Sequence, residues 1–461
     1  MKKASLIISA LMFSSLFYDK TIGINLLLFS LITIAIIFLN NKNSFRNKNT
    51  ILYSTIYLIT GLAVFFHDSI LTIIANLVSF LTLIGMVSKT RSSIYINWIN
   101  GLYSTIAGMF HRKFSEEEKY KEQKADKAVD YIHLIKIIGI PIIVVIIFIV
   151  LYKNGNPLFN GLIEKIDFSF INLHWLFMVG LGYYLFSNIH KPVNVEPATE
   201  LDLKTGNSLF KSDKFSAIKL QKENQMGLVL ISLLNALIII YLITDIMFLT
   251  NNMDLRASVF SIQVHSSINA LIVSIVIAIV ILLYVFRGDL NFFKENTTLK
   301  QLALLWIILN TLLVISIVIK NGQYIYYYGL TYKRIGVMVY LALSLIGLIS
   351  TLIKITQLKN TWYLFRLNVK TVFIVLIACS TINWDYQITS YNFKYAQSLD
   401  FNYLVKLSDN NTFLLKELTE TKNMDKKSIS IIERKYERYI KRLKSNAWQE
   451  LLYDNLKIKE N

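Results

Sequence analysis

The chain has 461 residues, of which 54% are apolar or aromatic and only 17% are charged. Soluble globular proteins carry roughly 25% charged residues, and a mean hydropathy of +0.47 excludes a soluble enzyme with one ordinary core. Long Ile and Leu runs with 28 Phe and 26 Tyr exclude a disordered chain. A single cysteine, Cys379, excludes an intramolecular disulfide and a cysteine-based metal site within one chain. The composition predicts an all-α, polytopic transmembrane helical bundle.

Apolar segments long enough to cross a membrane recur along the chain. A helix needs about 20 mostly apolar residues to cross a hydrocarbon core about 30 Å thick. By this measure we expect about eleven spans, at 4–18, 21–40, 51–66, 69–88, 131–152, 169–189, 226–249, 266–286, 301–320, 335–353 and 368–385. The first resembles a secretory signal, but it lacks a small-x-small cleavage site, which favours an uncleaved helix. Arg366 and Lys370 interrupt the approach to the last, and we expect them to snorkel to the interface.

The spans and the charged stretches divide the chain into four parts. We expect a four-span N-terminal region with an interfacial helix (1–111), a charged cytoplasmic linker (112–130) and a seven-span membrane domain (131–386). An extramembrane amphipathic helical tail follows (387–461). The Asn, Gly and Ser content of 92–111 favours an interfacial or re-entrant helix over a twelfth span.

The tail shows the pattern of three short helices. Asp400 stands at an N-cap position before the first of them, and 408–411 forms a turn. The second helix is expected at 412–422 and the third at 428–456, with an apolar stripe at spacings of three and four.

The net charge of +18 fits basic loops that face anionic lipid. With the N-terminus in the cytoplasm, the cytoplasmic segments hold 26 Lys and Arg, whereas the opposite loops hold 7. This asymmetry places the N-terminus inside and the tail outside, and the Lys-, Ile- and Asn-rich composition suggests the cytoplasmic (inner) membrane of a bacterium. We expect the lipid bilayer, anionic lipid included, as a partner, a protein partner through the tail, and no nucleic acid, because no basic cluster lies in a nucleic-acid-binding motif.

The sequence carries no motif for a bound metal or nucleotide. There is no G-x-x-x-x-G-K-[ST] phosphate loop and no H-E-x-x-H, and the six His are scattered. We therefore expect no metal and no cofactor.

Ionisable groups at membrane depth are costly, and each is a candidate site residue. Asp245 lies near the outer end of its span, and we expect it to pair with a loop cation such as Arg256. Asn235, Asn269 and Asn310 are expected to form interhelical hydrogen bonds. No carboxylate lies at a clear mid-span position, which argues against proton or cation coupling.

The most distinctive local feature is a Tyr-rich outer loop at 324–334, which ends in the first turn of the next helix. Its aromatic density is typical of a membrane interface. Arg334 opposes the dipole of that helix, so helix propensity does not explain it. It is either a lipid-facing cation or a ligand for a carboxylate, a phosphate or a lipid head group.

Three segments, YYYGLTYKRIGV, INWDYQITSYNF and LDFNYLVKLSDNNTFLLKEL, resemble a family of uncharacterised bacterial membrane proteins. This is domain of unknown function four-one-seven-three, which is similar to four-one-five-three. The matching positions are Tyr328, Gly329, Leu330, Thr331, Arg334, Asp385, Tyr391, Asn392, Asp400, Tyr403, Leu404, Leu407 and Ser408. The resemblance covers roughly 220–420, departs at Asn383-Trp384-Asp385 where the family has a Pro, and implies a topology without an established activity.

The resemblance suggests a candidate polar cluster at the outer face. We expect Arg334 to pair with Asp385, with Tyr328 and Asn392 hydrogen-bonded around them, so that the tail docks onto the spans. Such a pair is either structural or lines a site for an anionic ligand.

Three classes of function stay open. A non-enzymatic signalling or envelope-scaffold component is favoured by the helical tail, by the linkers 112–130 and 190–225, and by the lack of central carboxylates. A transporter or lipid-handling permease is supported only by the span count. A membrane-embedded transferase for a lipid-linked substrate would use Asp68, Asp385 and Arg334.

Overall fold

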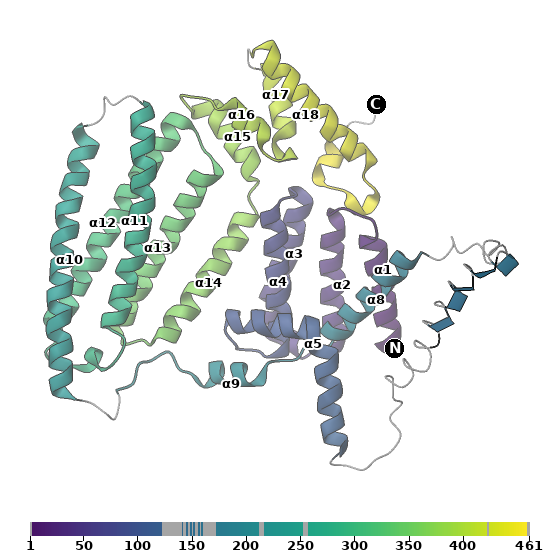
Figure 1. The fold of residues 1–461 in the computed structure, drawn as a ribbon, viewed down its shortest axis with the longest axis horizontal. Helices are drawn as coiled ribbons and strands as arrows, with labels where there is room; N and C mark the ends of the chain where they lie inside the picture. Colours follow the sequence, from purple (N-terminus) through teal and green to yellow (C-terminus); the bar gives the residue numbers. More distant parts are fainter. Residues whose placement is uncertain are drawn as a thin grey trace.

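The computed structural model describes residues 2–121, 172–211, 216–251, 257–421 and 424–458, with single positions between 141 and 159. Within these residues the regular elements are all α- or 3-10 helices, and one isolated bridge joins Ser208 to Lys359. The predicted all-α fold is therefore confirmed (Figure 1). Apart from those single positions, the expected span 131–152 lies outside the described residues.

The N-terminal elements form a first bundle. In chain order they are α1 (Lys2–Phe17), α2 (Ile24–Asn40), η1 (Ser44–Arg46), α3 (Lys48–Phe66), α4 (Ile70–Ser88), α5 (Ile94–Lys121), α8 (Leu173–Ile189) and α9 (Glu196–Lys204). Phe29, Tyr57 and Leu83 share one apolar core with Phe186 and Ile189 of α8. The sequence division assigns α8 to the second membrane domain, but α8 packs on α1 and α5.

The second bundle has its own apolar core. Its elements are α10 (Ala217–Asn251), α11 (Ala257–Val285), η2 (Asp289–Phe292), α12 (Thr297–Tyr328), α13 (Tyr332–Thr356) and α14 (Thr361–Ser380). Ile275, Leu313 and Leu348 pack together at the centre of α11, α12 and α13. α14 contacts α13 on one side and α3, α4 and α5 on the other, so it joins the two bundles (Figure 1).

The tail is a separate layer of short helices. It contains α15 (Trp384–Tyr395), α16 (Phe401–Lys406), η3 (Asp409–Asn411), α17 (Thr412–Thr421), α18 (Lys426–Ser445), η4 (Trp448–Glu450) and η5 (Tyr453–Lys457). Asp400 caps α16 as expected, because its carboxylate accepts from the Tyr403 amide at 3.0 Å. The prediction that the third helix reaches residue 456 is wrong. α18 ends at Ser445, since Glu450 turns back to accept from the amides of Ala447 and Thr21.

The described helices include seven that are long and apolar enough to cross a membrane: α3, α4, α10, residues 268–285 of α11, α12, α13 and α14. α1 (from Ala4) and α2 are apolar but shorter. The protein is therefore an integral membrane protein, and the count of eleven spans stays a prediction.

The connections between helices gather at two ends of the bundles. The α1–α2, α3–α4 and α12–α13 turns lie at the end that carries the tail, here called the tail end (Figure 1). The other end, here called the α9 end, has its own polar anchor, Asp202 of α9. Its carboxylate pairs with Arg366 of α14 at 2.9 Å and accepts from the hydroxyls of Ser93 at 2.7 Å and Tyr95 at 2.6 Å. Arg366 therefore joins α14 to α9, and its expected position at the membrane interface stays a prediction.

Two glycines set the close contact between α4 and α5. A Cβ at Gly85 would lie 2.0 Å from the Asn97 carbonyl oxygen, and one at Gly101 would lie 2.1 Å from the Leu81 carbonyl oxygen. Apolar helix faces gain little free energy when they exchange contacts with lipid for contacts with each other. Close approach of two backbones is then the main source of helix association. α5 thus packs directly on α4, whether or not it crosses the membrane.

We expect Gly85→Ala to lower the stability of the first bundle, because the added methyl group forces the two backbones apart. The cost should be about 1–3 kcal/mol, measured by thermal unfolding in detergent. Gly180→Ala is the matched control, since Gly180 is also helical and has nothing within 4 Å of an added Cβ. Equal losses for the two variants would contradict this role of Gly85.

Candidate functional site

The α12–α13 turn is the centre of the candidate site. The Tyr-rich segment is not a loop as expected, because α12 continues through Tyr328 and only three residues connect it to α13. Gly329 takes a φ of +79°, which favours glycine, and a Cβ there would lie 2.6 Å from Asn392 Oδ1. Thr331 then caps α13 by accepting from the Arg334 amide. Gly329 thus lets the tail approach the turn closely.

Arg334 is buried and caps the helix that precedes it. Its Nη1 donates to the carbonyl oxygens of Tyr328, at 2.8 Å, and of Gly329, at the C-terminus of α12. The guanidinium carbon lies 4.0 Å from the centre of the Tyr324 ring. A cation is favourable at a helix C-terminus. The contact of Arg334 with the end of α12 therefore offsets the unfavourable position of this cation at the start of α13.

The expected ion pair between Arg334 and Asp385 does not form, and none of the described ion pairs joins them. Asp385 accepts instead from the hydroxyls of Tyr332, at 2.7 Å, and Ser408. It is 3% exposed and lies in the first turn of α15, where the helix dipole favours a carboxylate. Neutral hydrogen-bond donors and the α15 helix dipole therefore stabilise the negative charge of Asp385, which we expected Arg334 to neutralise.

Asn392 joins the tail to the turn as a peptide group would. Its Oδ1 accepts from the Leu330 amide, and its Nδ2 donates to the Leu330 carbonyl oxygen at 2.9 Å. The Tyr332 amide donates to the Tyr403 hydroxyl at 2.9 Å, a second bond between turn and tail. Among the described residues, the Asn392 side chain thus hydrogen-bonds to Leu330 rather than to Arg334 or Asp385, and the Tyr328 hydroxyl is buried without a hydrogen-bond partner.

Lys435 secures the tail from the inside and was not singled out from the sequence. Its ammonium donates to the carbonyl oxygens of Val405, Leu407 and Ser408 and to Asn411 Oδ1, at 2.9–3.1 Å. Burial lowers the pKa of Lys435 to about 8. Its spacing in α18 continues the apolar stripe, and this was the only signal that it faces inward.

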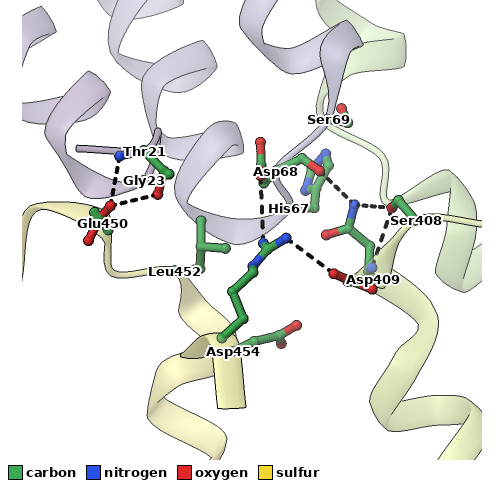
Figure 2. Close-up of polar contacts among 12 residues, drawn as sticks. Thr21, Gly23, His67, Asp68, Ser69, Ser408, Asp409, Glu450, Leu452 and Asp454 are labelled. Atoms are coloured by element: carbon green, nitrogen blue, oxygen red, sulfur yellow. Dashed lines mark hydrogen bonds and ion pairs between the residues drawn. The ribbon is translucent and has the colours of Figure 1, made fainter. Parts of the chain in front are cut away.

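The tail also binds the first bundle (Figure 2). Thr21 donates from both its amide and its hydroxyl to Glu450, and the Ile24 amide donates to the Leu451 carbonyl oxygen at 2.9 Å. In the α3–α4 turn, the Asp68 carbonyl oxygen accepts from the Asn410 side chain at 2.8 Å. The neighbouring His67 is buried against the Ser380 carbonyl oxygen, and burial lowers the pKa of this imidazole. The tail therefore bridges the two bundles at one end.

Two cavities, of about 360 and about 480 Å³, lie at this end. The larger of the two lies beside Arg334. Its walls are mostly apolar, from α11 and α13, with Asn269, Asn321, Lys333 and Arg334 as the polar groups. Lys333 and Asn269 are exposed, whereas Asn321 is buried and donates to the Arg334 carbonyl oxygen at 3.1 Å. The two charged residues that line this cavity, Lys333 and Arg334, are thus both positive.

Asp245 lies apart from this cluster, in the α10–α12 contact. Its expected partner, Arg256, lies outside the described residues, and Asp245 pairs with Lys320 of α12. Ser316 also donates to it, and Tyr241 donates at 3.2 Å. The side chains of the pair are 5% and 3% exposed, so two opposite charges are buried together.

The comparisons with known proteins now identify the family. A model of the Domain of unknown function (DUF4153) family matches residues 4–418. The chain belongs to this family. The match extends over the N-terminal helices, which the resemblance at 220–420 left out, and stops before α18. No curated protein and no solved structure matches the chain.

Among the residues of this DUF4153 member that the structure describes, no group of three or more His, Cys, Asp or Glu could hold a metal ion. The polar groups of the candidate site are instead suited to hold an anion or a backbone segment. The Arg334 cavity is the place at the α12–α13 turn where a ligand could enter.

We expect Asn392→Ala to loosen the tail, because it removes both bonds to Leu330 and leaves that half-buried peptide group without these partners. The cost should be about 1–3 kcal/mol, seen as faster hydrogen exchange at the Leu330 amide and faster proteolysis of the tail. Asn402→Ala, at an exposed position of α16, is the control. Unchanged exchange at Leu330 would contradict the role given to Asn392.

For the buried pair, we expect Lys320→Met to destabilise the protein by about 3–5 kcal/mol, because it leaves the Asp245 carboxylate without its counter-ion. The double variant Asp245→Leu with Lys320→Met should recover most of the loss, since no charge is then buried. Thermal unfolding in detergent measures both. Additive losses would show that the two charges do not interact.

Proposed function

We propose that this DUF4153 member is a non-enzymatic signalling or envelope-scaffold component that binds an anionic, lipid-like head group in the cavity beside Arg334. The supporting observation is a buried guanidinium at the edge of an apolar cavity. Among the described residues it has no carboxylate partner, and its hydrogen bonds to them use Nη1 alone. A guanidinium edge suits phosphate or carboxylate oxygens.

The remaining lining favours an amphiphile over a free ion. Lys333 adds a second cation, and Ile268, Ile272 and Val337 supply apolar surface between α11 and α13. An apolar cavity with a few convergent polar groups is the usual form of a ligand site. The head group would lie at Arg334 and Lys333 and the chain against the helix faces.

Such a ligand would act on the tail through the turn. Arg334 holds the carbonyl oxygens of Tyr328 and Gly329, and Asn392 holds the next residue, Leu330. An anion that draws the guanidinium toward the cavity weakens the cap of α12 and so changes the turn that the tail clamps. This link supports signalling or scaffolding over a purely structural role.

We place the protein in the cytoplasmic membrane of a bacterium, with the tail end outside. The support is the distribution of Lys and Arg, with 26 in the segments assigned to the cytoplasm and 7 in the opposite loops. A protein partner that binds the docked tail would then belong to the cell envelope.

We expect Lys333→Gln to reduce the retention of an anionic phospholipid at least fivefold and Arg334→Gln to reduce it further, because the site loses one of two cations. The measurement is native mass spectrometry of protein from nanodiscs of phosphatidylglycerol in phosphatidylcholine. Lys394→Gln, an exposed cation of α15, is the control, and Lys333→Gln tests the site without touching the α12 cap.

Retention that is equal in all variants would overturn the proposal. Solute uptake by reconstituted protein would overturn it in favour of a transporter or lipid-handling permease. Turnover of a lipid-linked phosphate would overturn it in favour of a transferase.

A further inference from the structure

A second cavity lies where the end of the tail covers the first bundle. Its volume is about 360 Å³, and it opens between α3, the α14–α15 turn and η5. The lining residues are Ile59, Leu62, Ala63, Phe66, His67, Thr381, Asn383, Tyr453, Asp454 and Lys457. None of them belongs to the cavity beside Arg334, so the two sites are distinct.

One wall of this cavity continues the outer face of α3. Ile59, Leu62 and Phe66 follow at helical spacing and are 42%, 42% and 46% exposed. Because α3 is long and apolar enough to cross a membrane, this face lies against acyl chains. The cavity therefore opens toward lipid on its α3 side.

The opposite wall carries one charge of each sign. Asp454 and Lys457 pair with each other at 2.7 Å, and the Tyr439 hydroxyl donates to the second carboxylate oxygen at 2.8 Å. Lys457 is 44% exposed and its ammonium lies 5.0 Å from the Tyr453 ring, so it has room to turn toward a ligand. The two lining charges sum to zero.

Aromatic rings stand beside the carboxylate. The rings of Phe66 and Tyr453 lie 5.1 Å apart and both line the cavity. An ammonium ion binds well where aromatic faces and a carboxylate converge. On the other side, Lys457 offers a cation to a phosphate. The side-chain NH₂ of Asn383 donates one hydrogen to the Asn410 carbonyl oxygen at 3.4 Å and has a second one for the phosphate.

We propose that this cavity binds a zwitterionic amino-phospholipid, with its ammonium at Asp454 and against the contacting rings of Phe66 and Tyr453. The phosphate lies at Lys457, and one acyl chain follows Ile59 and Leu62 down the face of α3. The internal pair of Asp454 and Lys457 is exchanged for two pairs with the lipid, so no charge stays buried alone. The lipid thereby fastens the end of the tail to the bilayer.

The test compares lipids in native mass spectrometry of the full chain from nanodiscs that contain equal phosphatidylethanolamine and phosphatidylglycerol. We expect phosphatidylethanolamine to be retained at least fivefold more often at this site than phosphatidylglycerol. Leu62→Trp, which fills the cavity from an exposed position and leaves the polar wall intact, should abolish that preference. Lys457→Gln removes the cation that holds the phosphate common to both lipids, so it should lower the retention of phosphatidylethanolamine itself. Asp454→Asn keeps an acceptor for Tyr439 and should lose the preference for the amine.

Lys441→Gln, an exposed cation of α18 away from the cavity, is the control and should change nothing. Lys333→Gln should also leave the phosphatidylethanolamine signal unchanged, so the fate of this inference is separate from that of the Arg334 site. An unchanged lipid ratio in Asp454→Asn and Leu62→Trp, with the tail still protected from protease, would overturn the proposal. Equal retention of both lipids by the Lys333→Gln variant, in which the Arg334 cavity has lost one of its two cations, would overturn it as well.

Discussion

The pairing of Asn392 with the Leu330 peptide group is the contact on which the tail end depends. It requires a turn without a side chain at Gly329, and it brings α15 against the start of α13. Tyr332 can then reach Asp385, and Arg334 is left to close the end of α12. The candidate site is thus built around a backbone segment that a side-chain amide recognises.

Polar contacts also decide how the two bundles are joined. Apolar helix faces gain little by leaving lipid for each other, so packing alone does not fix which helices meet. At the α9 end, Asp202 gathers α5, α9 and α14 through Arg366, Ser93 and Tyr95. At the tail end, Glu450 holds the α1–α2 turn while Asn392 holds the α12–α13 turn. The tail therefore contacts both bundles.

The two cavities differ in charge in a way that matches this arrangement. The one beside Arg334 has positive lining charges, whereas the one under η5 has one charge of each sign and an aromatic pair. Both lie next to segments that the tail covers. A membrane protein whose tail rests on two lipid-facing sites can respond to the composition of the bilayer, and this is the setting in which we place the proposed function.

Most of the helices could be predicted from the sequence, because the cost of exposing polar backbone in lipid requires long apolar segments that are visible in any single chain. The sequence also placed Arg334, Asp385 and Asn392 at one end, since alternating spans return each turn to a known side. The partners of these residues followed from how the helices and the tail pack. Arg334 binds the carbonyl oxygens of Tyr328 and Gly329 rather than Asp385, and Asp245 pairs with Lys320 of another helix. A hydropathy profile does not show how each helix is rotated about its axis or where the tail docks. A shift of one helical turn between neighbouring helices changes which charged residues pair.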